Sequence, residues 1–153
     1  MLTYSAGLRL HEVKCLKLSD IDSARMMVHV VQSKGDKDRY TILSPVALNI
    51  LREYWNRYRP GVWLFETRPG KAMSDRTAQL IFKQSLLKAG IKKAASFHTL
   101  RHSFATHLME QGVSLPIIQQ LLGHSSLKTT SGYLHVQQYS VDAVKSPLDT
   151  LSL

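Results

Sequence analysis

Residues 98–108, HTLRHSFATHL, place three histidines and an arginine on a stretch that otherwise has the apolar spacing of a buried helix. In a helix, His98 and Arg101 would lie on one side, because residues three apart are surface neighbours. A guanidinium beside an imidazole near a helix N-terminus, where the macrodipole favours anions, can bind a phosphate. We therefore predict an anion site on the helix face opposite the apolar stripe of Leu100 and Phe104.

The histidines also allow a metal site as an alternative. His98 and His102 are four residues apart, as are His11 and Cys15, so each pair could reach one ion. Neither pair has the nearby acidic or cysteine ligand that strong zinc patterns contain. A zinc-dependent enzyme or a structural zinc domain is thus the weaker hypothesis, and we expect no metal.

Phosphate transfer without a metal needs several cations, an acid for the leaving oxygen and a nucleophile. Residues that could supply these parts are Arg9, Lys34, His124 and Tyr133. Each also has an ordinary structural explanation, such as an ion pair between Arg9 and Glu12. The residue types alone leave both interpretations open.

The composition indicates one globular domain with a basic surface. The chain has 153 residues, of which 44% are hydrophobic and 20% charged. Its 20 Lys and Arg against 11 Asp and Glu leave a net charge of +9, which favours nucleic acid as the partner. No apolar run approaches the roughly 20 residues of a membrane span, and the first residues lack a secretory pattern. Together with the lone Cys15, this predicts a cytoplasmic protein without membrane contact.

Local patterns predict the elements that must position these residues. A short helix with Leu10, Val13 and Leu16 on its apolar side follows a break at Gly7. Two β-rich runs, 26–32 and 39–44, flank a polar connection and predict a hairpin with Lys34 at its turn. Longer helices are predicted between these start and stop signals: Ser44-Pro45 and Pro60-Gly61, Ser74 and Gly90, Ser96 and Gly112, Ser114 and Gly123, with a last helix from Thr129 or Thr130. The expected fold is mainly helical with a small antiparallel β-sheet, an α+β class.

Five segments between residues 4 and 136 resemble the catalytic domain of the tyrosine recombinases, the phage-integrase and Xer-like family of DNA-breaking and DNA-joining enzymes. They are YSAGLRLHEV, SKGDKDRYTIL, HTLRHSFATHL, LLGHSSLKTT and SGYLHV, in that order. The resemblance implies the catalytic-domain fold of that family. It also implies site-specific recombination or integration, the chemistry of mobile elements, with no cofactor.

The resemblance further implies how the scissile phosphate is bound. Arg9 and Arg101 would clamp its non-bridging oxygens, a task that suits the bidentate guanidinium group better than lysine. His98 would assist proton handling, and His124 would donate a hydrogen bond to a phosphate oxygen. Glu12 would support the site by fixing a neighbouring catalytic side chain.

The bond-breaking roles implied by the resemblance belong to two more residues. Tyr133 would attack the phosphorus and form a 3′-phosphotyrosyl bond, while Lys34 would protonate the departing 5′-oxygen. Because the phosphotyrosyl bond keeps the energy of the broken phosphodiester, rejoining would need no ATP.

The organisation expected from the resemblance is a single catalytic domain over residues 1–153. The tail, about residues 140–153, would be mobile or exchanged between protomers, and the N-terminal core-binding domain of the family would be absent. The expected partner is double-stranded DNA, on which relatives assemble into a tetrameric synapse. The alternative is a truncated, catalytically weak module that binds DNA or pairs with a full-length recombinase.

Overall fold

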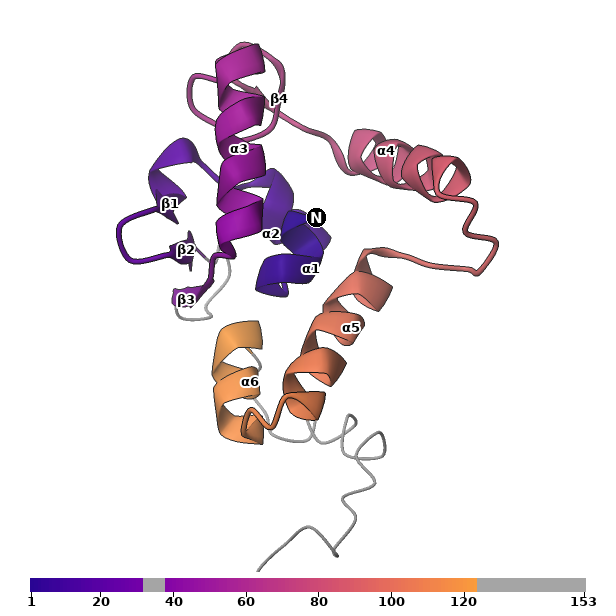
Figure 1. Ribbon diagram of the computed structural model, residues 1–153. Helices are drawn as coiled ribbons and strands as arrows, with labels where there is room; N and C mark the ends of the chain where they lie inside the picture. Colours follow the sequence, from indigo (N-terminus) through magenta and orange to yellow (C-terminus); the bar gives the residue numbers. More distant parts are fainter. Residues whose placement is uncertain (32–37, 124–153) are drawn as a thin grey trace, which may run out of the picture.

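The computed structural model describes residues 1–31 and 38–123, and Figure 1 shows how its elements are arranged. The helices are α1 (Leu2–Ala6), α2 (Leu10–Lys14), α3 (Pro45–Tyr58), α4 (Asp75–Lys88), α5 (Phe97–Glu110) and α6 (Leu115–Leu122). The strands are β1 (Ile21–Asp22), β2 (Met27–Val30), β3 (Arg39–Ile42), β4 (Glu66–Arg68) and β5 (Lys71–Ala72). The predicted α+β class is confirmed. None of the helices in this described part is both long and apolar enough to cross a membrane.

Strands β2 and β3 form the predicted antiparallel pair. Val28 lies opposite Thr41 and Val30 opposite Arg39, and β1 pairs with the other side of β2. All four of these residues are buried, so the inward face of β3 carries polar side chains. The two-residue β1 and the β4–β5 ribbon were not predicted, because such short strands show no clear alternation.

Serine caps set the starts of the three long helices. The side-chain oxygens of Ser44, Ser74 and Ser96 each accept a hydrogen bond from the backbone N–H three residues later. Such a bond satisfies one of the N–H groups that the first helical turn leaves unpaired. Helix α6 ends at Gly123, whose φ of +66° lies in the left-handed region. The predicted boundaries of these helices and of α6 are closely confirmed because each depends on a local signal. The last predicted helix, from Thr129 or Thr130, lies outside the described residues.

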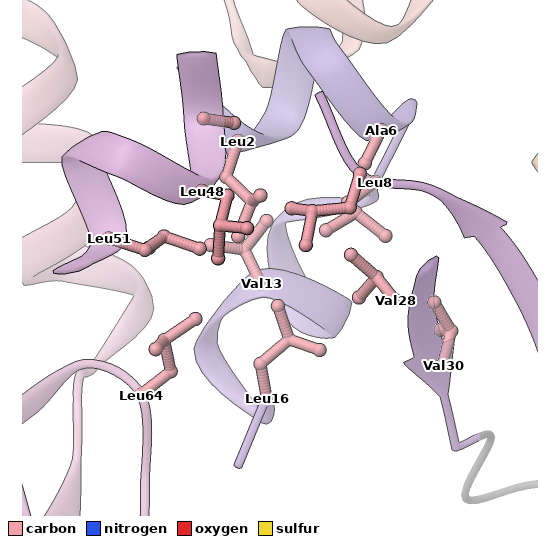
Figure 2. Close-up of a cluster of buried hydrophobic side chains, with 12 residues drawn as sticks. Leu2, Ala6, Leu8, Val13, Leu16, Val28, Val30, Leu48, Leu51 and Leu64 are labelled. Carbon is pink, nitrogen blue, oxygen red and sulfur yellow. The ribbon is translucent and has the colours of Figure 1, made fainter. Parts of the chain in front are cut away.

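The larger apolar cluster lies among the first two helices, the sheet and α3 (Figure 2). Figure 2 shows Leu8, Val13 and Leu16 close to Val28 of β2 and Leu48 of α3. These side chains are at most 8% exposed. Because burying one such side chain contributes about 1.5–3 kcal/mol, this cluster anchors the short helices, which are too short to be stable alone.

A smaller cluster joins α5 to α6, which lie side by side in Figure 1. Its buried members are Phe104, Ala105, Met109, Ile118 and Leu122. The turn at Gly7 touches this cluster: a Cβ atom there would lie 2.5 Å from Cδ1 of Phe104 and 3.0 Å from Cδ2 of Leu122. The two apolar clusters therefore meet at the turn between α1 and α2.

Candidate active site

Arg101 lies where the two apolar clusters meet and is only 5% exposed. Its Nη1 donates to the carbonyl oxygen of Gly7 at 2.6 Å, and its Nη2 donates to the carbonyl oxygen of Leu122. Nη1 is also 3.6 Å from Oε2 of Glu12. One guanidinium thus links α5 to the turn after α1, to α2 and to the end of α6.

The predicted placement of Arg101 opposite the apolar stripe is wrong. Arg101 shares the buried face of α5 with Phe104, Ala105 and Met109. A long charged side chain can remain on that face because carbonyl oxygens and a carboxylate meet it there, as burial of a charge requires. His98, one turn earlier on α5, is exposed.

Arg9 and Glu12 form the ion pair that the sequence allowed. Arg9 precedes α2, and its backbone N–H donates to Oε2 of Glu12 at 2.7 Å, which caps the helix start. Its Nη1 donates to Oε1 of the same carboxylate at 2.9 Å. The side chain of Arg9 is 37% exposed, whereas that of Glu12 is 7% exposed. Arg9 is therefore both tied to the buried carboxylate and open to solvent.

Arg39 completes the cluster, and the sequence analysis did not select it. Its Nη1 and Nη2 each donate to one oxygen of Glu12, both at 2.8 Å, in a bidentate pair. The signal that could have found it is the alternation along β3, which puts Arg39 on the inward face with Thr41. Because a buried charge is costly unless it is paired, an inward-facing arginine on a strand predicts a buried acidic partner. We refer to Arg9, Glu12, Arg39 and Arg101 as the arginine cluster.

The C-terminal end of α6 is bound to all three arginines. Nε of Arg39 donates to the carbonyl oxygen of Leu121 at 2.9 Å, Arg101 donates to that of Leu122, and Arg9 donates to that of Gly123 at 3.4 Å. The last carbonyls of a helix lack partners within the helix and carry its negative dipole end. Three consecutive carbonyls are thus satisfied by three different cations.

The charge of Glu12 depends on these neighbours. Burial by itself raises the pKa of Glu12, but hydrogen bonds and charge from Arg39, the Arg9 backbone N–H and the charge of Arg101 together lower it to about 2. The carboxylate is therefore ionised at neutral pH. Three guanidinium groups around one carboxylate leave a net charge of +2 in a partly buried site, which is suited to a phosphate diester and its transition state.

Three predicted site residues, Lys34, His124 and Tyr133, lie outside the described residues. Within residues 1–31 and 38–123, no three histidine, cysteine or acidic side chains gather in a way that could hold a metal ion. The alternative pair His11 and Cys15 is in contact, with Sγ 3.8 Å from Nε2. The structure therefore brings together Arg9, Glu12 and Arg101 and adds Arg39 to them.

Residues 1–139 match the phage integrase family. A putative integrase/recombinase, y4eF, of Sinorhizobium fredii is 44% identical over 152 residues, covering 97% of this chain and 59% of the relative. Tyrosine recombinase XerC of Chlamydia trachomatis is 41% identical over 141 residues, covering 88% of this chain and 44% of the relative. The chain thus spans about half the length of the curated relatives it matches.

Solved structures share the fold described above. The crystal structure of XerA recombinase superposes with a TM-score of 0.84 at 30% identity, covering 95% of this chain and 57% of that one. XerH recombinase bound to its palindromic difH substrate superposes with a TM-score of 0.77 at 27% identity, covering 92% and 42%. The arrangement of the described helices and strands is therefore that of a recombinase catalytic domain.

Proposed function

The chain belongs to the phage integrase family, and from this we propose that it is the catalytic domain of a tyrosine recombinase that cleaves and rejoins double-stranded DNA. The observation that carries the proposal is the convergence of Arg9 and Arg101, 92 positions apart in the sequence, on the buried carboxylate of Glu12. A fold that needed only stability would rarely bury so much unbalanced positive charge, because burying charge costs free energy. An anionic ligand balances it.

In the proposed reaction, Arg9 and Arg101 bind the non-bridging oxygens of one DNA phosphate and stabilise the charge that develops on them. Tyr133 is the nucleophile: it gives its phenolic proton to His98, and its oxygen forms a bond to phosphorus as the bond from phosphorus to the 5′-oxygen breaks. Lys34 gives its proton to that departing oxygen, and His98 and His124 serve as hydrogen-bonding partners of the phosphate. Attack of a 5′-hydroxyl on the phosphotyrosine reverses these steps and rejoins the strand.

Covalent trapping tests the proposal. The chain and its Tyr133→Phe variant are each mixed with nicked random-sequence duplexes, with and without EDTA, and the products are separated on a denaturing gel. We expect a slowly migrating protein–DNA adduct with the wild-type chain only. Salt-sensitive DNA binding without an adduct would favour the alternative of a DNA-binding or recombinase-pairing module. An adduct that EDTA abolishes would favour the zinc alternative.

Replacing Arg9 by alanine is expected to slow adduct formation about 10²-fold, the usual cost of removing one donor from a developing oxyanion. Arg9 is suited to this test because its side chain is 37% exposed, whereas those of Arg39 and Arg101 are each 6% exposed. Arg25→Ala is the matched control, since it removes the same charge from a side chain that is 76% exposed. Equal rates for both variants would show that only the net charge of the protein matters.

The partners follow from the same proposal. The net charge of +9 supports an electrostatic attraction to double-stranded DNA. Self-association on DNA, with the tail from about residue 140 exchanged between protomers, would complete the reaction between two DNA sites. We place the protein in the cytoplasm, as expected for a member of a family that acts on DNA.

A further inference from the structure

Arg39 is a buried member of the arginine cluster, and the proposed reaction assigns it no role. Its side chain is 6% exposed, and three of its nitrogens make hydrogen bonds: two with Glu12 at 2.8 Å and one with the carbonyl oxygen of Leu121 at 2.9 Å. These bonds connect β3 to α2 and to the end of α6. A residue tied to three elements can set the distances between them.

The first consequence concerns charge. Oε1 of Glu12 accepts hydrogen bonds from Nη1 of Arg39 and from Nη1 of Arg9. Oε2 accepts hydrogen bonds from Nη2 of Arg39 and from the backbone N–H of Arg9. Without Arg39, the single negative charge of Glu12 would be balanced by Arg9 and Arg101 alone. The net charge of the cluster would fall from +2 to +1, and the two remaining guanidinium groups would be drawn toward the carboxylate rather than toward a ligand.

The second consequence concerns position. A Cβ atom at Gly123 would lie 2.7 Å from Cδ of Arg39 and 3.0 Å from its Nε, so the α6 end packs directly against this side chain. Arg39 thereby determines how close the end of α6 comes to β3. The carbonyl oxygens that hold Arg101 and Arg9 belong to that same end, at Leu122 and Gly123.

We infer that Arg39 is a positioning residue of the cleavage site, which holds the Glu12 carboxylate and the α6 end so that Arg9 and Arg101 remain placed for the scissile phosphate. This role rests on the proposed function. Lysine cannot replace Arg39, because one ammonium group cannot form the bidentate pair and reach Leu121 at the same time.

The test uses two variants of the full chain, Arg39→Met and Gly123→Ala, with Gly90→Ala as a control. Gly123 and Gly90 have the same left-handed backbone, with φ of +66° and +67°, but nothing lies within 4 Å of a Cβ atom at Gly90. Single-turnover adduct formation is measured on saturating nicked random-sequence duplexes from pH 5 to 7. Thermal melts establish the folded fraction, and fluorescence anisotropy establishes DNA binding.

We expect Arg39→Met to form the adduct about 10–100-fold more slowly, because small misplacements of catalytic groups have costs of this size. Its rate relative to wild type should fall further toward pH 5, since Glu12 would bind a proton more readily without Arg39, and a neutral carboxyl group no longer forms the ion pairs that position Arg9 and Arg101. Gly123→Ala, which keeps every charge, should be slower than Gly90→Ala and tests the inference even if Arg39→Met fails to fold.

Three results would contradict the inference, and each can be told apart from the others. If the wild-type chain forms the adduct and Arg39→Met matches it after correction for the folded fraction and at each pH, the positioning role is wrong. Equal rates for Gly123→Ala and Gly90→Ala would also overturn it. If the wild-type chain forms no adduct, the proposed function fails first, and the role of Arg39 fails with it.

Discussion

Glu12→Gln is expected to lower the free energy of unfolding by about 3 kcal/mol at pH 7, because it leaves buried guanidinium groups without their shared anion. The side chain of Glu12 is 7% exposed, so water cannot replace the lost charge. Glutamine keeps the volume and one acceptor oxygen, but it cannot accept the bidentate pair from Arg39. Urea unfolding monitored by circular dichroism measures the change. Glu53→Gln, at an exposed position of α3, should have little effect.

The pH dependence of stability provides a second check on Glu12. Its pKa is lowered from 4.5 to about 2 on folding, so its contribution is complete above pH 4.5 and lost as the pH falls toward 2. A shift of this size corresponds to roughly 3 kcal/mol. The wild-type chain and Glu12→Gln should therefore differ most at neutral pH and converge near pH 2. A difference that does not depend on pH would mean that the charge of Glu12 is unimportant.

Gly7→Ala is expected to destabilise the fold by about 3 kcal/mol, since it combines a strained backbone with overpacking. Gly7 has a φ of +63°, and an added Cβ would lie 2.5 Å from the buried ring of Phe104. The carbonyl oxygen of Gly7 also accepts a hydrogen bond from Arg101, so the strain would reach the arginine cluster. Adduct formation should therefore fall more than the folded fraction does.

Gly112→Ala separates the two causes. Gly112 also has a left-handed backbone, with φ of +81°, but nothing lies within 4 Å of a Cβ atom placed there. Its substitution should cost only the backbone term, about 1 kcal/mol. If Gly7→Ala and Gly112→Ala melt at the same temperature, the close approach of Gly7 to Phe104 does not contribute to stability.

The helices were predictable from the sequence because their limits depend on a few neighbouring residues. Ser44, Ser74 and Ser96 cap the helices that follow them. Gly123 ends α6 because glycine adopts the left-handed conformation without strain. The same holds for the pair of β2 and β3, where two β-rich runs flank a polar connection. These signals act over a few residues and need no knowledge of distant contacts.

The arginine cluster was only partly predictable. The resemblance selected Arg9, Glu12 and Arg101 as a site, and the structure brings them into contact. Arg39 lies in SKGDKDRYTIL, one of the segments that carry the resemblance. Only its contacts with Glu12 and Leu121 distinguish it from the other basic residues of that segment. The expected placement of Arg101 opposite the apolar stripe was wrong, because helical spacing assigns a side chain to one face of a helix but does not show which segments pack against that face.

Capping groups, glycine turns and apolar spacing along the chain were thus enough to establish the order and limits of the main elements. Tertiary packing determined the burial of Arg101 and the inclusion of Arg39, since both depend on segments that meet only when the two apolar clusters form. The carboxylate of Glu12 and the carbonyl oxygens at the end of α6 are 109 or more positions apart in the sequence. Only their approach makes a site in which the buried guanidinium groups of Arg39 and Arg101 are stable while that of Arg9 remains open to solvent.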